Sequence, residues 1–216
     1  MKLVNLGSNN TLLNQFVSEI RDVTVQNDRL RFRKNIERIG EVMAYEVSKA
    51  LPYAERDVTT PLGTARVSVP NAPIVLGTIL RAGLPFHQGF LNFFDQAENA
   101  FVSAYRKERH DTLNFVIEYL AAPPLNGKTL ILVDPMLATG GSMELSYKAL
   151  RTRGVPSTLH MAVIVATQRA VDLMAGLFPD DNVTLWCAAI DPALNERHYI
   201  VPGLGDAGDL CFGEKE

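Results

Sequence analysis

The chain has 216 residues, a length that suits one domain, and 47% of them are hydrophobic, which is enough for a sizeable core. The net charge is −3, so no excess of basic residues indicates binding to nucleic acid. Its two cysteines are too few for a disulfide framework, and its four histidines share no metal-ligand spacing. The N-terminus lacks the apolar run of a signal peptide, and no run of about eighteen apolar residues predicts a membrane span. We therefore expect a cytoplasmic protein with no nucleic-acid or membrane partner.

The N-terminal quarter predicts two helices, over residues 11–22 and 26–51. In the second helix, apolar residues from Leu30 to Val47 recur at helical spacing. The same helix begins with a basic cluster: Arg29, Arg31, Arg33 and Lys34. We interpret this cluster as a solvated helix face, and a docking face for a phosphate or a partner subunit is the alternative. After Pro52, short β segments flank Pro61-Leu62-Gly63 and predict a hairpin.

From residue 73 onward, buried strands alternate with helices. The predicted strands cover residues 73–80, 99–105, 113–120, 128–134, 157–166 and 183–190. The predicted helices cover residues 84–94, 142–153 and 168–177. This order predicts an α/β fold, with a mainly parallel central sheet flanked by helices, in a single domain of residues 1–216. The N-terminal helices (1–51) and a C-terminal loop rich in Pro and Gly (191–216) are appendages to that domain.

The loop that follows strand 128–134 has the strongest chemical pattern. Asp134 ends the strand, and Thr139-Gly140-Gly141-Ser142 leads into the next helix. Ligands of open α/β sheets bind beyond the carboxyl ends of the strands. A glycine-rich turn into a helix N-terminus suits a phosphate, and a carboxylate can accept hydrogen bonds from sugar hydroxyls. The alternative is an ordinary strand–helix turn with Ser142 as the N-cap.

Three further segments follow predicted strands. Arg81-Ala82-Gly83 suits an anion held by a guanidinium group and the backbone together; the alternative is an arginine that only caps a carbonyl or pairs with an acid. Residues 106–111 are either an exposed hairpin tip or a mobile arm that closes over a polyphosphate, with Arg106 nearest the strand. The glycine-rich run 199–209 can read a flat heterocycle through its backbone groups; the alternative is a flexible tail.

Three of these segments resemble those of one family. Residues 134–142 resemble the phosphoribosyl diphosphate (PRPP) loop of uracil phosphoribosyltransferases, and Pro135 replaces the second acid that most type I phosphoribosyltransferases have. Residues 79–84 resemble the family's diphosphate-binding loop, and residues 199–208 resemble its uracil-binding loop. The resemblance implies a glycosyltransferase that converts uracil and PRPP to UMP and diphosphate, with Mg²⁺ carried by PRPP. It also implies a small β-hairpin arm, a C-terminal loop hood and a homodimer or higher homo-oligomer.

The same resemblance implies a role for each site residue. PRPP would bind to Arg81, Arg106, Asp134, Pro135, Met136, Leu137, Ala138, Thr139, Gly140, Gly141, Ser142 and Asp206. Uracil would be surrounded by Ile200, Gly205, Asp206 and Ala207. The catalytic roles would fall to Asp134, Arg106 and Asp206, the last as a candidate base on position alone. No protein side chain would bind the metal directly.

The chain departs from the family pattern at three places: residues 85–88, residues 107–111, and His198, which stands where the family usually has glycine. These departures concern the lid and the response to effectors such as GTP more than the core reaction. Two other functions stay open. One is an RNA-binding regulator that keeps the nucleotide pocket, and the other is a phosphoribosyltransferase for purines or orotate. The amphipathic N-terminal helices are a candidate subunit contact.

Overall fold

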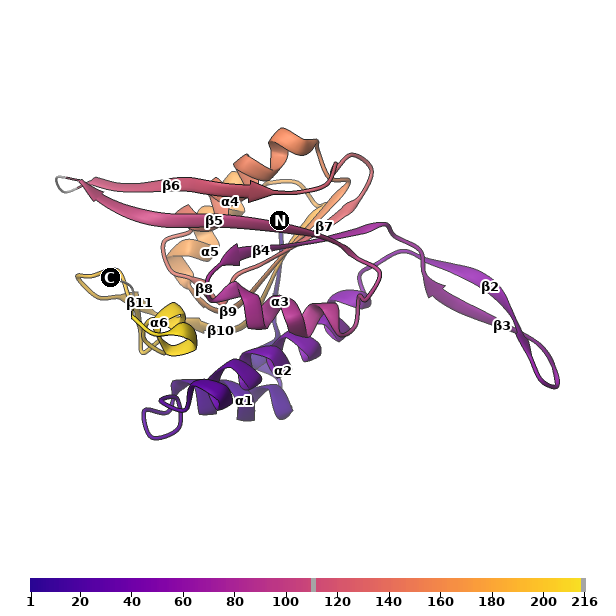
Figure 1. Cartoon of the computed structure of the whole chain (residues 1–216), viewed down its shortest axis with the longest axis horizontal. Coiled ribbons are helices and arrows are strands. Elements are labelled where there is room, and N and C mark those ends of the chain that lie inside the picture. Colours follow the sequence, from indigo (N-terminus) through magenta and orange to yellow (C-terminus); the bar gives the residue numbers. More distant parts are fainter. Residues whose placement is uncertain (110–111, 215–216) are drawn as a thin grey trace.

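The computed structural model describes residues 1–109 and 112–214, of which residues 105–109 and 112–116 are described by their backbone alone. A central sheet runs in the order β1-β10-β9-β7-β4-β5-β6, with β8 added beside β9 (Figure 1). All neighbouring strands are parallel except β5 and β6, which confirms the predicted mainly parallel sheet. The strands are β1 (Lys2–Asn5), β4 (Ile74–Leu80), β5 (Glu98–Arg109), β6 (Thr112–Ala121), β7 (Thr129–Val133), β8 (Met136–Leu137), β9 (Thr158–Thr167) and β10 (Val183–Asp191).

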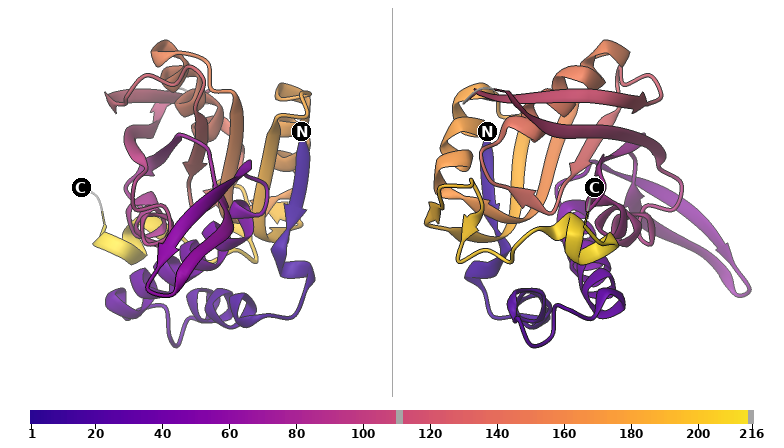
Figure 2. Two further views of the ribbon diagram at one scale, coloured as in Figure 1. Left: turned by 90° about the vertical axis from the view of Figure 1, so that its right-hand side faces the viewer. Right: turned by 60° about the vertical axis from the view of Figure 1, so that its left-hand side comes forward.

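Helices cover both faces of this sheet, as Figure 2 shows in two views. One face carries α1 (Leu12–Arg21), α2 (Arg29–Ser48) and α3 (Gly83–Leu91), and the other carries α4 (Gly141–Leu150) and α5 (Gln168–Leu177). The central strand β7 is buried throughout and contributes side chains to the cores on both faces of the sheet. Its Ile131 packs toward α1–α3, whereas its Leu130 packs toward α4 and α5. This two-sided burial explains why the strand is a continuous apolar run.

Local side-chain caps set where the N-terminal helices begin. Thr11 accepts a hydrogen bond from the Leu13 N–H (3.2 Å), and Asp28 accepts one from the Arg31 N–H (3.0 Å). The second helix therefore starts later than predicted. Leu30 was expected on its apolar face but is 61% exposed, and Phe32 is the buried side chain instead. One apolar face of each helix packs inside the chain, while Leu12, Leu30 and Tyr45 are exposed, so the predicted subunit contact through these helices stays a prediction.

Two β elements differ from the prediction. Strand β1 was not predicted; it pairs in parallel with β10 at the edge of the sheet. The predicted hairpin is longer than expected, since β2 (Tyr53–Thr60) and β3 (Gly63–Pro70) form an antiparallel arm that projects from the body (Figure 1). Short 3-10 turns complete the connections at η1 (Leu6–Ser8) and η2 (Arg151–Arg153).

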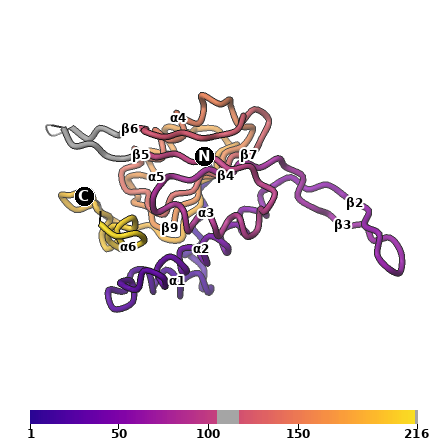
Figure 3. The backbone as a smooth tube through the Cα atoms, viewed as in Figure 1, coloured from indigo at the N-terminus to yellow at the C-terminus, as the bar shows by residue number. Residues whose placement is uncertain are grey.

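The C-terminal segment is more ordered than the predicted loop. It contains the antiparallel pair β11 (Ala193–Leu194) and β12 (Ile200–Val201), followed by the short helix α6 (Ala207–Phe212). The backbone path in Figure 3 brings α6 back to the N-terminal helices, where Arg33 Nη1 donates to the Cys211 carbonyl at 2.7 Å. Across the described residues, no helix has the length and apolar character needed to cross a membrane.

Candidate active site

A pocket of about 250 Å³ lies beyond the carboxyl ends of β4 and β7, the position expected for ligands of such sheets. Three chain segments meet there: the loop after β4, the loop after β7 and the C-terminal segment. The pocket is lined by Ile79, Leu80, Arg81, Ala82, Ala104, Asp134, Met136, Ala138, Ser142, His198, Tyr199, Ile200, Gly205, Asp206, Ala207 and Gly208. The sequence motifs that were separate in the chain therefore share one cavity.

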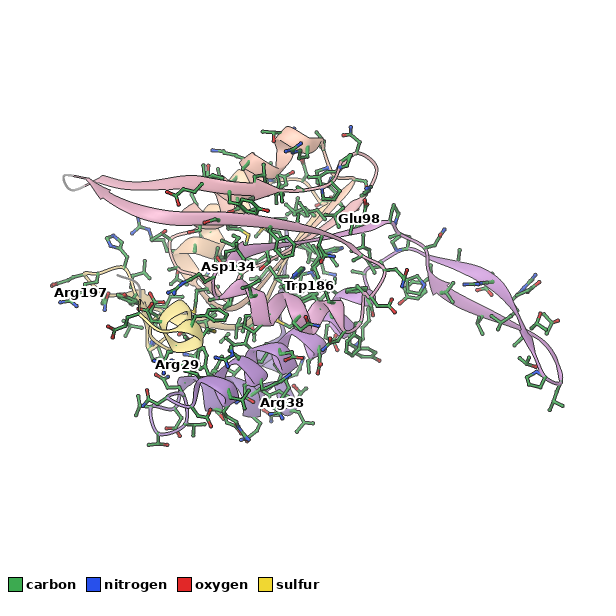
Figure 4. All side chains as sticks on the ribbon, in the orientation of Figure 1. Arg29, Arg38, Glu98, Asp134, Trp186 and Arg197 are labelled. Atoms are coloured by element: carbon green, nitrogen blue, oxygen red, sulfur yellow. The ribbon has the colours of Figure 1, made fainter. Side chains whose placement is uncertain are left out.

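Asp134 is the carboxylate at the end of β7, and Figure 4 shows it near the centre of the molecule. Its backbone N–H donates to the Ala162 carbonyl at 3.1 Å, which continues the sheet ladder by one residue. Burial raises the pKa of this carboxyl from 3.8 to about 7, and a 3.4 Å hydrogen bond from the Met136 N–H opposes that rise. Asp134 is only partly exposed in the pocket, and among the described side chains no cation pairs with it, which suits a ligand that supplies hydroxyl donors.

The residues after Asp134 form strand β8 rather than a free loop. The Pro135 carbonyl accepts hydrogen bonds from the N–H groups of Ile164 and Val165, both at 3.0 Å, and Leu137 pairs with Ala166. Strand geometry alternates the side chains. Met136 and Ala138 line the pocket, whereas Leu137 is buried in the core on the α4–α5 face. Pro135 is also buried, so these two residues can offer a ligand only their backbone.

Gly140 makes the sharp turn into α4. Its φ is +87°, a left-handed conformation that favours glycine, and a Cβ atom there would lie 2.9 Å from Met174 Cε. Helix α4 begins at Gly141 without a side-chain cap. Ser142 is thus not the N-cap that the ordinary-turn alternative expected. Ser142 lines the pocket together with Asp134, whereas Thr139, Gly140 and Gly141 are not among its lining residues. The N-terminal turn of a helix that starts beside a pocket suits a phosphate.

Thr167 supports this loop from the neighbouring strand. Its hydroxyl donates to the Ala138 carbonyl at 2.7 Å and accepts from the Ala170 N–H at 3.1 Å. It therefore caps α5 and fixes the pocket loop at the same time. Sequence reasoning missed this residue, because only the pairing of β8 with β9 brings it next to Ala138.

Arg81 connects the loop after β4 to the C-terminal segment. Its Nη2 donates to Asp209 Oδ1 at 2.9 Å and its Nη1 to the Gly213 carbonyl at 3.2 Å. The structure thus shows the carbonyl and acid contacts that the alternative reading expected. Arg81 also lines the pocket, and its buried Nε has no hydrogen-bond partner among the described residues. Gly83 is required behind it, since a Cβ atom there would lie 2.2 Å from Thr78 Oγ1.

The C-terminal wall of the pocket contains all four residues assigned to uracil: Ile200, Gly205, Asp206 and Ala207. Asp206 Oδ1 accepts from the Asp209 N–H at 3.0 Å and caps α6. Gly205 has a φ of +92°, which turns the chain into this helix. In the structure the Asp206 carboxylate therefore caps α6 and stabilises the loop. This geometry does not indicate that it acts as a base.

Three lining residues of this wall were not assigned from the sequence: His198, Tyr199 and Gly208. His198 has a φ of +62°, in the region that glycine adopts easily, and within the described part of the protein its buried Nδ1 has no hydrogen-bond partner. The sequence signal for it was its place at a usual glycine. Gly208 lies against Arg81, whose Nη2 would be 3.4 Å from an added Cβ atom.

Arg106 lies in strand β5, opposite Phe115 of β6, so residues 106–109 belong to a strand and not to a hairpin tip. Its side chain and residues 110–111 lie outside the described part of the protein. Ala104, two residues earlier on the same strand, lines the pocket. The backbone of β5 thus leads from the pocket wall toward Arg106, and its ligand contact stays a prediction.

The carboxylates of the pocket bear on metal binding. Within the described residues, no group of three or more His, Cys, Asp and Glu side chains could hold a metal ion. Two carboxylates line the pocket, and Asp206 already caps a helix. One available carboxylate fits Mg²⁺, which commonly binds through one or two carboxylates, water and substrate phosphates.

Comparison with known proteins identifies the family. A family model described as uracil phosphoribosyltransferase matches residues 7–214. The chain belongs to the uracil phosphoribosyltransferase family. A curated uracil phosphoribosyltransferase of Porphyromonas gingivalis is 64% identical over the full length of both chains. One of Methanothermobacter thermautotrophicus is 37% identical and covers 86% of this chain and 85% of its own.

Solved structures agree with the fold. The AQ2163 protein of Aquifex aeolicus superposes with a TM-score of 0.87 at 31% identity, covering 98% of each chain. A hypoxanthine phosphoribosyltransferase of Staphylococcus aureus gives a TM-score of 0.52 at 13% identity, covering 86% of this chain and 83% of that one, a likeness of fold alone. Family membership supports the reading drawn from the three motifs over the regulator and over a purine or orotate enzyme.

Proposed function

We propose that this site transfers the phosphoribosyl group of PRPP to uracil and releases UMP and diphosphate, the central step of pyrimidine salvage. The observation that carries the proposal is the shared pocket. Asp134 and Ser142 of the loop after β7 line it together with the Ile200–Ala207 wall, and Arg81 from the loop after β4 lines the same cavity. A phosphate loop and a heterocycle wall placed in one cavity suit a reaction that joins a sugar phosphate to a base.

In this proposal the ribose end of PRPP binds along the loop after β7. Asp134 accepts hydrogen bonds from the ribose hydroxyls, which offsets the burial that raises its pKa. The 5′-phosphate binds to the first turn of α4, to the Thr139 and Ser142 hydroxyls and to the backbone of residues 139–141. Met136 and Ala138 form the adjoining wall, and Pro135 and Leu137 contribute through the backbone and the core.

The diphosphate end binds to Arg81 and Arg106. The bond from ribose C1 to the diphosphate oxygen breaks, the bond from uracil N1 to C1 forms, and the N1 proton is lost. Negative charge grows on the diphosphate, so guanidinium groups stabilise the transition state more than the ground state. Mg²⁺, when bound to the diphosphate with Asp134 as the available protein carboxylate nearby, neutralises part of the same charge.

Uracil binds against Ile200, Gly205, Asp206 and Ala207. We assign its recognition to backbone groups of this wall, which would discriminate against cytosine because its amino group presents a donor where uracil presents an acceptor. Asp206 holds the wall in shape by capping α6.

The test is turnover by the purified protein with Mg²⁺, PRPP and a panel of nucleobases. We expect UMP and diphosphate in equal amounts from uracil, and no product from orotate or hypoxanthine. Absence of UMP at every pH near neutrality would overturn the proposal. Binding to RNA with a steep salt dependence, together with no turnover, would favour the regulator instead.

We also propose that the protein works in the cytoplasm as a homodimer or higher homo-oligomer. The N-terminal helices stay a candidate for the contact, since Leu12, Leu30 and Tyr45 on them are exposed. Light scattering of the purified protein tests this, and a mass equal to the 23.8 kDa chain at working concentration would contradict it.

A further inference from the structure

The C-terminal wall of the pocket, which contains Ile200, Gly205, Asp206 and Ala207, is called the uracil wall below. An ion pair outside the pocket contacts the same stretch of chain. Arg21, the last residue of α1, donates from Nη1 to Asp191 Oδ2 at 2.8 Å and from Nη2 to Asp191 Oδ1 at 2.9 Å. The Asp191 side chain is 7% exposed and that of Arg21 is 22% exposed. Asp191 ends β10, so this two-point contact ties the N-terminal helix to the edge of the sheet that holds the pocket.

The pair also holds both backbone groups of one glycine. Gly203 N–H donates to Asp191 Oδ2 at 2.8 Å, and the Gly203 carbonyl accepts from Arg21 Nη1 at 2.9 Å. Gly203 lies between two pocket-lining residues, Ile200 and Gly205. Its own turn is tight, with a φ of +57° and a Cβ position only 2.1 Å from the Ile200 carbonyl oxygen. Holding the Gly203 backbone in place therefore also restrains the positions of Ile200 and Gly205 on either side of it.

A second side chain from the same region acts on the next residue. Gln26, between α1 and α2, donates from its Nε2 to the Leu204 carbonyl at 3.3 Å and to the Ile20 carbonyl at 3.0 Å. Neither Arg21, Asp191 nor Gln26 lines the pocket. Consecutive wall residues are thus held from outside the cavity by groups that a ligand in it does not touch.

We propose that Arg21 and Asp191 are positioning residues for the uracil wall, setting the place of its backbone groups through Gly203. The inference rests on the proposed function, because it assigns to the pair the uracil half of that reaction. A wall that reads its ligand through backbone groups has no side chain to readjust, so small displacements weaken recognition of the base directly. The PRPP half, on the loops after β4 and β7, has its own supports in Thr167 and Gly140.

The test compares Arg21→Met with a matched control, Arg31→Met. Arg31 also makes a two-point pair with a carboxylate of α1, from Nε and Nη2 to Glu19 at 2.8 and 2.9 Å, and it holds the pKa of Glu19 at about 2. That pair joins α1 to α2, and none of the hydrogen bonds of Arg31 and Glu19 among the described residues reaches the C-terminal segment. For Arg21→Met we expect the KM for uracil to rise about tenfold or more, with the KM for PRPP and kcat changed less than about threefold. Arg31→Met should leave all three unchanged.

Two further measurements separate positioning from simple loss of stability. Arg21→Lys keeps the charge but not the planar fork, and it should restore part of the uracil affinity. Amide hydrogen exchange over residues 199–207 should be faster in Arg21→Lys than in the unmodified protein and unchanged in Arg31→Met. If both Arg21 variants keep the uracil KM within twofold of the unmodified protein, or if the PRPP KM rises as much as the uracil KM, the inference is wrong. The exchange measurement needs no turnover, so unchanged exchange refutes the positioning role even if the activity proposal fails separately.

Discussion

The Asp134 carboxylate, when ionised, should lower the free energy of unfolding near neutral pH, and the substitution Asp134→Asn should remove this destabilisation. Folding raises its pKa from 3.8 to about 7, because burial disfavours the carboxylate. The folded state therefore binds the proton more tightly than the unfolded chain. The stability that the protonated form contributes is fully present below pH about 4 and is lost as the pH rises to about 7.

The magnitude follows from about 1.4 kcal/mol per pKa unit. Between pH 5 and pH 8 the unmodified protein should lose about 3 kcal/mol of unfolding free energy at this residue. Asp134→Asn keeps the side-chain size and an acceptor for the Met136 N–H but carries no charge. The advantage of the variant should therefore grow by about 3 kcal/mol over this interval, while its rate of UMP formation falls sharply.

Urea unfolding of both proteins at pH 5 and pH 8, without PRPP or metal, measures this difference. The slopes with urea should match, so that the midpoints report stability alone. A stability gap between the two proteins that stays constant from pH 5 to pH 8 would refute the reasoning. A gap that grows in the opposite direction would show that the carboxylate is stabilised in the folded state.

Three further predictions test other parts of the site. Gly140→Ala should lose about 1–3 kcal/mol of stability and most activity, because φ is +87° and the added Cβ would clash with the Met174 side chain. The control Gly176→Ala on α5 has open space around it and should be neutral or slightly stabilising, as thermal unfolding of both variants can measure. Arg81→Lys should raise the KM for PRPP about tenfold in initial-rate assays, because lysine lacks the planar fork; a KM within twofold of the original would contradict a diphosphate role. His198→Gly should raise the free energy of unfolding by up to about 1 kcal/mol in urea titrations by relieving the left-handed φ of +62°, and a clear loss of stability would show that the imidazole is needed.

Sequence patterns predicted those parts of the molecule whose cause is local. The run 128–134 is apolar throughout because both faces of β7 are covered, and its strand was predicted. Gly140 was placed in the turn into α4 because only glycine takes that backbone conformation without strain. The three motifs were assigned to one site because the carboxyl ends of parallel strands lie at one edge.

The missed features depend on contacts between distant segments. Strand β1 is four residues long and exposed at its start, and only its pairing with β10 makes it a strand. Pro135 and Leu137 were placed among the ligand-binding residues because the family resemblance covers the whole run 134–142, whereas in the structure both side chains are buried beside β9. Arg21 and Asp191 are 170 positions apart, and no periodicity connects them.

The hydrogen bonds that hold the C-terminal wall of the pocket also affect the order in which the chain folds. The Arg21–Gly203 hydrogen bond spans 182 positions, and the Arg33–Cys211 bond spans 178. Contacts of such long range close late, since the entropy of ordering the intervening chain must be offset first. The part of the sheet from β4 to β10, whose strands are closer together in the chain, can therefore form before the wall exists, and local unfolding should release the wall first. Proteolytic nicking near residues 195–205 would then abolish base binding while most of the fold survives, which makes resistance to cleavage there a direct measure of an intact binding site.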